Sequence, residues 1–325
     1  MAREVRPQLF QIVVPLPGSP LKEINSYVFT ADDRTLVVDT GMRRPECHEA
    51  LTAGFAEIGV DLEKTDFVST HLHADHCGLI PDLLASGRKA WMGAGDAESM
   101  RREFSWSADS DMGRYLARSG FPAEELESSF KNHPAAKFGS GAQVEYLPLH
   151  EGDVLEIGDY RLEVVDTPGH TFGHVSLYDR AKQLFVAGDH VLGDITPNIQ
   201  AWSDDHDPLA LFIDSLDKVD RLDVDLCLPG HRSLIDDFHG RVSELKEHHF
   251  ERAEEAKGIL HKGEQTAYET AGQMHWDIRA KSWEDFPIMQ RWFATGETIA
   301  HLRWLEERGE IARRDADDRI LYSAG

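Results

Sequence analysis

Residues 71–76 read His-Leu-His-Ala-Asp-His, which places three imidazoles and one carboxylate within six residues. In an extended segment alternate side chains point to the same side, so His71 and His73 can face one site. Asp75 and His76 then fall where a following helix is predicted to begin. Imidazole nitrogens and carboxylate oxygens are zinc-type ligands, and burying four such groups together without a metal would be costly. This stretch therefore predicts a metal site.

Further candidate ligands follow later in the chain, each beside a glycine at the end of a predicted strand. They are His170 in TPGH, Asp189 in AGDH and His231 in PGH. In layered α/β proteins, residues at strand ends gather along one edge of the sheet. The complete ordered set is much more specific than a single histidine-rich turn, which also occurs by chance on surfaces.

The remaining pattern predicts an α/β fold class. Short β-rich runs predict strands at 9–16, 25–30, 35–39, 66–70 and 89–93, with helices near 45–58 and 76–86. Further strands are predicted within 143–188, then a helix near 208–219 and a strand at 223–230. Strands alternating with helices in this way form layers around a shared core.

Two segments depart from this alternation. Residues 94–142 carry polar helical patterns with scattered aromatic side chains, and we interpret them as a helical insertion. From about 240 the chain becomes helical and charged. Residues 298–324 predict a helix followed by a hairpin turning at Asp315 to Asp318, which resembles a winged-helix module. The expected domains are therefore 1–240 and 241–325.

The charge balance argues against nucleic acid as a partner. With 34 basic and 58 acidic residues the net charge is 34 − 58 = −24, and non-specific nucleic-acid binding depends on Lys and Arg. Residues 263–325 carry 8 basic and 12 acidic side chains, a balance of 8 − 12 = −4, whereas a DNA-reading wing is normally basic. A lid or a homodimer contact is the preferred role of the extension. Its candidate interface residues are Trp292, Phe293, Leu302, Trp304 and Leu305.

Cysteine usage and hydropathy bear on the compartment. Cys47, Cys77 and Cys227 lie far apart and form no CxxC pair, which suits a reducing compartment. No apolar run reaches the roughly 18 to 20 residues that cross a bilayer. The stretch from Met1 to Phe10 has no apolar core of the secretory type. We therefore expect a cytoplasmic protein with no membrane partner.

Taken in order, the ligand motifs resemble those of the metallo-β-lactamase superfamily, and within it the glyoxalase II-like hydrolase branch. The resemblance covers roughly residues 9 to 240. It implies a four-layer αβ/βα sandwich built from two similar halves, with the site on one edge. Residues 1–240 would then be the catalytic domain, and 241–325 a C-terminal helical, winged-helix-like extension.

The resemblance also implies a role for each ligand. One metal ion would be held by three imidazoles: His71, His73 and His170. The second would be held by Asp75, His76 and His231. Asp189 would bridge the two. Zinc is the first expectation for these two divalent ions, and iron or manganese are alternatives because His and Asp ligands suit all three.

The expected activity is hydrolysis of a small ester-type acyl substrate, such as a thioester or a lactone. Two metal ions can share a hydroxide that attacks the carbonyl, because each lowers the pKa of the bound water. Asp75 is the residue expected to orient the nucleophile and to assist proton transfer. A bridging aspartate such as Asp189 is typical of the hydrolase and nuclease branches, so β-lactamase activity is not expected. A phosphodiesterase or ribonuclease, and a non-enzymatic partner-binding protein, remain as alternatives.

The substrate pocket is harder to predict than the metal ligands. Aromatic side chains near the metal motifs, together with one histidine, are candidate contacts: Phe104, Trp106, Tyr115, His190 and Trp202. Packing inside the inserted helices explains any one of the aromatic residues equally well. Beyond His231 we find no cluster of basic residues that would grip a glutathione carboxylate, which is a departure from glyoxalase II.

Other residues near the motifs have expected supporting roles. Asp39 is a candidate to orient a ligand imidazole, and starting the Thr40-Gly41 turn is an equally good explanation. Cys77 is expected to pack beneath the site, and His174 to act as a structural hydrogen-bonding residue. The pair His248 and His249 lies in a charged helical pattern, which predicts a solvated face.

Overall fold

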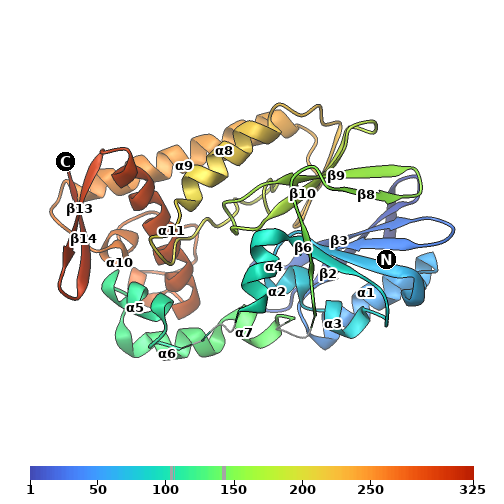
Figure 1. The fold of residues 1–325 in the computed structure, drawn as a ribbon. Helices are drawn as coiled ribbons and strands as arrows, with labels where there is room; N and C mark the ends of the chain where they lie inside the picture. Colours follow the sequence, from blue (N-terminus) through green and yellow to red (C-terminus); the bar gives the residue numbers. More distant parts are fainter. Residues whose placement is uncertain (103–104, 106, 141–143) are drawn as a thin grey trace. The chain divides into compact units, whose positions relative to one another are not determined.

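The computed structural model describes residues 1–102, 105, 107–140 and 144–325. The chain forms two compact units, and each of them is assembled from segments that are distant in sequence (Figure 1). Unit 1 comprises Met1–Glu103, Lys137–Pro197 and Ser215–Val242. Unit 2 comprises Phe104–Ala136, Asn198–Asp214 and Ser243–Gly325.

The first sheet of unit 1 follows the order of the chain, β1-β2-β3-β4-β5-β6-β7. The strands are β1 (Ala2–Arg6), β2 (Leu9–Pro15), β3 (Glu23–Thr30), β4 (Thr35–Val38), β5 (Thr65–Ser69), β6 (Ala90–Gly93) and β7 (Leu147–Leu149). Strands β1 to β4 pair antiparallel, and β4 to β7 pair parallel. Because parallel strands end at the same edge, the residues that follow β4, β5 and β6 come together there.

The second sheet of unit 1 has the order β12-β11-β10-β9-β8. Its strands are β8 (Val154–Ile157), β9 (Tyr160–Asp166), β10 (Val175–Asp179), β11 (Leu184–Gly188) and β12 (Leu226–Pro229). Strands β8 to β11 pair antiparallel, and β11 pairs parallel with β12. Strands β9, β11 and β12 therefore run in one direction, and the segments that follow them share an edge.

A buried apolar core fills the space between the two sheets. Leu36 and Val38 of β4 and Leu162 and Val164 of β9 belong to it, each pair two positions apart on its strand. Alternate residues of a strand face the same side of the sheet, so the residue between each pair faces the other side. Val37, between Leu36 and Val38, packs in a separate core.

Helices cover the outer faces of both sheets. In the core outside the first sheet lie Leu51 and Phe55 of α1 (Pro45–Ile58), a helix with Pro45 in its first turn and Gly59 in the left-handed conformation at its end. Outside the second sheet, the ring of Phe185 lies 5.5 Å from that of Phe238. Phe238 begins α9 (Phe238–Leu260). These layers form the predicted αβ/βα sandwich.

The helix predicted near 76–86 is wrong in its extent. The structure has two short helices instead, α2 (Ala74–Cys77) and α3 (Ile80–Leu83). Pro81 lies in the first turn of α3, and it has no N–H to donate to the carbonyl of Cys77. The break keeps α2 as a single turn directly after His73.

The described part of 94–142 is mainly helical, which agrees with the helical pattern predicted there. It contains α4 (Ala94–Arg101), α5 (Asp111–Arg118), α6 (Ala123–Asn132) and α7 (Pro134–Phe138). Helix α4 lies in unit 1, whereas α5 and α6 lie in unit 2. Helix α8 (Pro208–Val219), which precedes β12, has the predicted bounds.

The C-terminal part of unit 2 is a helical region with a β wing. It contains α10 (Ala267–Ala271), α11 (Ile288–Glu307) and the antiparallel hairpin of β13 (Ile311–Ala316) and β14 (Arg319–Ala324). Gln265 also pairs with Tyr322 of β14, which adds a short third strand segment to the wing. A short 3-10 helix at Trp283–Asp285 also belongs to this part of the chain, whereas another, at Leu62–Lys64, lies in unit 1. The winged-helix-like extension is thus confirmed as a local arrangement.

The residues suggested for a homodimer interface are mostly buried inside unit 2. Trp292, Leu302 and Leu305 have exposed fractions of 1% or less, and Trp304 has 9%. The ring of Trp292 packs against those of Phe121, Phe130 and Trp202. These residues build the core of the unit, so that part of the prediction is wrong.

The prediction for His249 is also wrong. Its side chain is fully buried, and its Nδ1 lies 3.2 Å from Nε2 of His301 on α11. The ring of Phe212 packs against it at 5.2 Å. The charged pattern of α9 does not reveal this burial, because the burial of His249 depends on which helix packs against α9.

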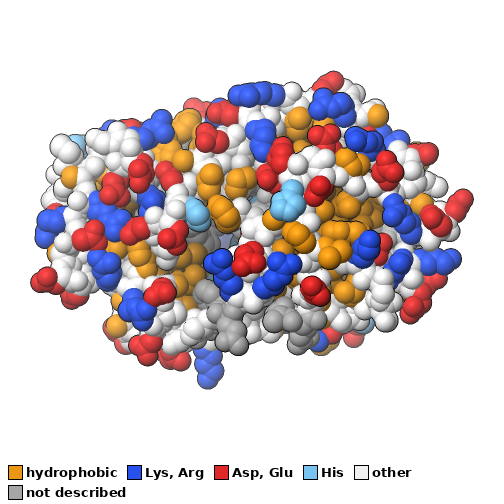
Figure 2. Space-filling model, viewed as in Figure 1, with side chains coloured by type: hydrophobic (Ala, Val, Ile, Leu, Met, Phe, Trp, Pro, Cys, Tyr) orange, Lys and Arg blue, Asp and Glu red, His pale blue; other side chains and the backbone are white. Residues whose placement is uncertain are grey.

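Charged and apolar side chains are mixed on the visible face of the molecule (Figure 2). Figure 2 shows acidic and basic side chains interspersed on the face in view, with apolar side chains between them. Within the described ranges, no helix has the length and apolar character needed to cross a membrane.

Candidate metal centre

The residues predicted as ligands come together in unit 1, where both sheets end. The candidate donor atoms form three overlapping groups, and within each group they lie within 4.8 Å of one another. The groups are His71, His73 and His170; His71, His76 and Asp189; and Asp75, His76 and His231. Three of the candidate ligands, His71, His76 and His231, are fully buried, with 0% exposure. Each of the seven residues follows a strand end that the sheet topology brings to the shared edge.

The first group consists of three converging imidazoles. Nδ1 of His73 lies 3.0 Å from Nε2 of His71 and 3.0 Å from Nε2 of His170. Burial lowers the pKa of His71 well below its ordinary value, and the neighbouring His76 and His73 lower it further. A neutral imidazole offers a lone pair, so this group can bind one cation through ring nitrogens.

The second group combines imidazoles with carboxylates around Asp189. Nε2 of His231 lies 3.4 Å from Oδ2 of Asp189 and 3.5 Å from Oδ2 of Asp75. Nε2 of His76 lies 3.5 Å from Oδ1 of Asp189. Although burial alone would raise it, the pKa of Asp189 is held well below its ordinary value by His231 and His76.

Several polar atoms of this group lack a hydrogen-bond partner. They are Nε2 of His76, Nε2 of His231 and Oδ1 of Asp189, all of them buried among the described residues. A buried polar atom without a partner costs about 1–3 kcal/mol. A cation between these atoms would satisfy all three at once, so the donor set fits a metal ion.

Hydrogen bonds on the far side of two rings fix their tautomers. Nδ1 of His231 lies 2.6 Å from the carbonyl oxygen of Glu23, which can only accept. Nδ1 of His76 lies 2.8 Å from Oδ2 of Asp39. In each ring Nδ1 therefore carries a proton, which leaves Nε2 as the nitrogen that faces the centre and can bind a metal ion once it is deprotonated.

Asp39 contacts a ligand imidazole, as one of its two predicted roles requires. Oδ1 accepts a hydrogen bond from the Thr70 amide (2.8 Å), and Oδ2 accepts one from the Thr70 hydroxyl (2.9 Å) in addition to His76. The backbone of Asp39 is in the left-handed conformation, with φ of 60°. Aspartate tolerates that region better than most residues do.

His174 supports Asp189 from behind through a directed chain of hydrogen bonds. Its Nε2 accepts from the Asp189 amide at 3.1 Å, so its Nδ1 must donate, at 2.7 Å, to the hydroxyl of Thr167. Thr167 lies 2.9 Å from the hydroxyl of Ser176, which donates to the carbonyl of Ala187. The structural role predicted for His174 is confirmed. Cys77, fully buried with its thiol donating to the Leu72 carbonyl, packs beneath the site as predicted.

The structure describes three of the five predicted pocket residues. The hydroxyl of Tyr115 donates to Asp204 at 2.9 Å, and the ring of Trp202 lies 5.2 Å from that of Trp292, so both pack within unit 2. His190 is in unit 1 with 0% exposure. Phe104 and Trp106 lie outside the described residues. The role of these residues in substrate binding stays a prediction.

Two residues at the centre were missed by the sequence analysis. Asp96, 1% exposed, accepts hydrogen bonds beside His71 and His170, and burial raises its pKa to about 6. Phe172 follows His170 closely and is 55% exposed. Neither belongs to a spacing motif, and an isolated Asp or Phe carries no signal of its own in a sequence.

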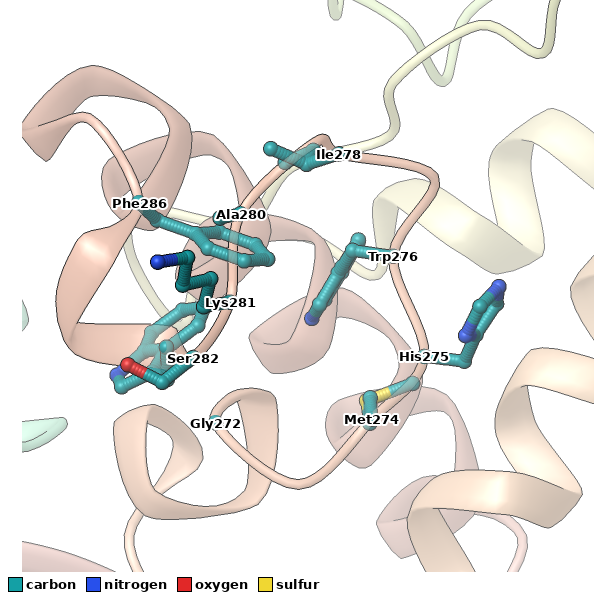
Figure 3. A pocket seen from close by; sticks show the side chains of 10 residues that line it. Gly272, Met274, His275, Trp276, Ile278, Ala280, Lys281, Ser282 and Phe286 are labelled. Carbon is teal, nitrogen blue, oxygen red and sulfur yellow. The ribbon is translucent and has the colours of Figure 1, made fainter.

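A separate groove lies within unit 2 (Figure 3). Its volume is about 320 Å³, and Trp276, Phe286 and Lys281 are among its lining residues. The guanidinium of Arg252 lies 4.2 Å from the ring centre of Trp276 and holds that ring in place. The groove contains none of the candidate ligands.

Comparisons with known proteins agree with this geometry. The family model described as metallo-beta-lactamase superfamily matches residues 20–231, and one described as metallo-beta-lactamase-like, C-terminal domain, matches 284–324. A metallo-beta-lactamase family protein from Thermus thermophilus has 28% identity and a TM-score of 0.82, with 99% of this chain and 100% of that chain covered. A beta-lactamase domain protein from Burkholderia ambifaria has 26% identity and a TM-score of 0.77, with 100% and 95% covered.

Curated relatives are more distant. An atrochrysone carboxyl ACP thioesterase of Aspergillus novofumigatus is 22% identical over 74% of this chain, which spans 60% of that protein. The acyl-coenzyme A thioesterase MBLAC2 of Homo sapiens is 28% identical over 64% of this chain and 72% of its own length. A lactamase-like protein of Pestalotiopsis fici is matched over 50% of its length, so the chain spans about half to three quarters of these relatives. Because the superfamily model matches well over half of its residues, the chain belongs to the metallo-beta-lactamase superfamily.

Proposed function

We propose that this chain is a metal-dependent hydrolase that cleaves acyl thioesters. The observation that carries the proposal is the set of buried atoms without partners on His76, His231 and Asp189, which face one another at the shared sheet edge. Two of these imidazoles are held in the tautomer that a metal ligand requires. A protein that only used this edge for packing would gain nothing from such an arrangement.

The proposed centre holds two divalent ions. One would be held by the converging imidazoles of His71, His73 and His170, and the other by Asp75, His76 and His231. Asp189, which lies between His76 and His231 and 3.7 Å from Nε2 of His170, would bridge the two. Zinc suits this nitrogen-rich set, and iron or manganese are the alternatives.

Ions held there would lower the pKa of a bound water and act as Lewis acids on the acyl carbonyl. Thioester hydrolysis joins the water oxygen to the acyl carbon and breaks the C–S bond, and one water proton passes to the departing thiolate. We assign the transfer of that proton to Asp75, a role supported by its 7% exposed carboxylate and by its contact with Nε2 of His231. The fixed tautomers of His76 and His231 keep their N–H groups away from the reacting atoms.

The thioester class is supported by the names of two relatives, one acting on an acyl-carrier-protein thioester and one on an acyl-coenzyme A. Phe172 offers an exposed apolar surface two positions after His170, where an acyl chain could lie. Lactones share the ester-type carbonyl and are the secondary expectation. The net charge of −24 disfavours nucleic acid as a substrate.

The test combines metal analysis with a substrate panel. Wild type, Asp189→Ala and the matched control Asp194→Ala would be purified without chelators and measured by mass spectrometry for metal content. Hydrolysis of an acyl-coenzyme A, a lactone and a phosphodiester would be measured in parallel. We expect about two metal ions per chain in wild type and in the control, and loss of both metal and thioesterase activity in Asp189→Ala. A protein that takes up no metal, or that cleaves the phosphodiester but not the thioester, would refute the proposal.

A further inference from the structure

Asp96 makes hydrogen bonds that reach beyond its own helix. It lies in the first turn of α4, directly after β6, and its side chain is 1% exposed. Oδ2 accepts from the amide of Leu72 at 2.9 Å and from the hydroxyl of Thr171 at 2.7 Å. Oδ1 accepts from the amide of Gly173 at 2.7 Å.

The donors belong to two different loops. Leu72 lies between His71 and His73, whereas Thr171 and Gly173 follow His170 in the loop after β9. One carboxylate thus joins the loop from the first sheet to the loop from the second sheet. These are the two loops whose imidazoles converge in the first donor group.

The backbones around Asp96 are in direct contact. A Cβ atom added to Gly93 would lie 2.1 Å from the carbonyl oxygen of Gly173, and one added to Gly173 would lie 2.0 Å from the Asp96 amide. This close approach is open only to glycine. It allows the short side chain of Asp96 to reach both loops at once.

We propose that Asp96 is a positioning residue for the three-imidazole metal group, which sets the separation between His170 and the pair His71 and His73. The inference rests on the proposed function, since it requires that a metal ion bind there. Asp96 acts through backbone amides and does not touch the ion. His76 and His231 of the second group are held instead by Asp39 and by the carbonyl of Glu23.

The substitution Asp96→Asn tests this role with almost no change in shape. The amides of Leu72 and Gly173 are fixed donors on different oxygens of Asp96, and a carboxamide has only one acceptor oxygen. In either orientation its NH₂ group must face one of these amides. The variant therefore loses one of the two backbone contacts and should loosen one loop.

Asp179 provides a matched control in the same unit. It is also 1% exposed, and its two oxygens accept from the amides of Arg161 (3.0 Å) and Lys182 (3.1 Å). Asp179→Asn removes the same kind of contact at β10, away from the loops that carry His71 and His170. Its effect measures the general cost of losing one backbone acceptor.

The experiment is a titration of metal-free protein with cobalt(II), followed by visible absorption and by calorimetry. Wild type and Asp179→Asn should each bind two equivalents of cobalt(II), and the two affinities of the variant should equal those of wild type. In Asp96→Asn one equivalent should bind as in wild type, while the other should be weakened about 10–100-fold, with an altered ligand-field spectrum. Thr171→Val, which removes only the hydroxyl, should show a smaller weakening of that same equivalent, and it decides the question if Asp96→Asn does not fold.

Each other result overturns the inference. If Asp96→Asn binds both equivalents like wild type, Asp96 does not position the group. If Asp179→Asn is weakened equally, the effect is one of general stability. If wild type itself takes up no cobalt, the proposed function fails and this inference fails with it, which distinguishes the two failures.

Discussion

Gly188, next to Asp189, occupies a position where the backbone conformation and the close neighbours permit only glycine. Its φ is +54°, and an added Cβ would lie 2.8 Å from Nε2 of His174 and from the side chain of Thr70. Gly188→Ala should therefore lower the free energy of unfolding by about 1–3 kcal/mol, and should displace Asp189 from His174. Urea denaturation followed by circular dichroism measures the first effect, and metal content measures the second.

Gly258 of α9 is the control for that substitution. An added Cβ would meet nothing within 4 Å, and its φ is not in the left-handed region. Gly258→Ala should leave metal content unchanged and raise stability by up to about 1 kcal/mol, because alanine is the better helix former. Equal stability of the two variants would contradict the argument for Gly188.

Phe172 should affect substrate binding and not folding. Its ring is 55% exposed, so Phe172→Ala should leave the melting temperature nearly unchanged. Burying a Phe side chain is worth about 1.5–3 kcal/mol, so KM for a long-chain acyl thioester should rise about tenfold or more, with kcat little changed. KM for an acetyl thioester should stay the same. Phe250→Ala, at a 40% exposed position in unit 2, is the control, and an equal rise in KM there would count against a contact at Phe172.

Sequence reasoning found the candidate ligands, which the structure brings together. His71, His73 and Asp75 could be predicted because their types and spacing alone indicate metal binding. Asp96 could not be, because its role exists only after folding has brought the loops that follow β5 and β9, which carry His71 and His170, next to α4. Its ionisable side chain carries no information on which distant amides it will meet.

Helices and strands differ in how far the sequence predicts them. Helix α1 (Pro45–Ile58) has the predicted bounds, because Pro45 in the first turn and Gly59 after the last are local signals. The predicted helix at 76–86 is instead two short helices, α2 and α3, with Pro81 in the first turn of α3. Burial of a polar helix face, as at His249, depends on tertiary packing, which periodicity within one helix does not contain.

Glu297 on α11 should make the stability of unit 2 depend on pH. Burial raises the pKa of this carboxyl to about 7, against Arg252 and Asn198, which lower it. Since the unfolded pKa is lower, near 4.5, the unfolded state binds fewer protons between pH 4.5 and 7. Protonation of Glu297 therefore stabilises the folded state fully below pH 4.5, and this stabilisation is lost as the pH rises towards 7. The rise in pKa from 4.5 to about 7 corresponds to a free-energy change on the order of 3 kcal/mol.

Glu297→Gln should remove this dependence. The amide oxygen can still accept from Asn198, and Arg252 keeps its contacts with Glu255 and the His275 carbonyl. Urea unfolding between pH 5 and 8 should give a flatter profile for the variant and greater stability at pH 8. Glu307→Gln, on the same helix but 60% exposed, should keep the wild-type dependence of the free energy of unfolding on pH. If Glu297→Gln also kept that dependence, its assignment to Glu297 would be refuted.

At the scale of the whole molecule, the layered α/β class and the shared edge follow from the order of strands and ligands. The grouping of segments into units does not. Asp204 accepts hydrogen bonds from Tyr115 and Arg313, and so links three segments of unit 2 that lie far apart in sequence. Tyr115 comes from the helical insertion, and Arg313 comes from the C-terminal hairpin. No local pattern in the sequence predicts that these segments pack as one unit.

Metal removal should therefore affect the two units unequally, because all seven candidate ligands belong to unit 1. A ligand that binds only the folded state stabilises it by about 4 kcal/mol at a thousand times its dissociation constant. Chelation should thus increase amide hydrogen exchange in the loops around His71, His170 and His231, and leave α11 and the β13–β14 hairpin nearly unchanged. Exchange measured by mass spectrometry on loaded and chelated protein tests this, with Asp189→Ala expected to respond little to the chelator. An equal increase in unit 2 would mean that the two units unfold together, and that the metal centre stabilises the entire chain and not only the unit that contains it.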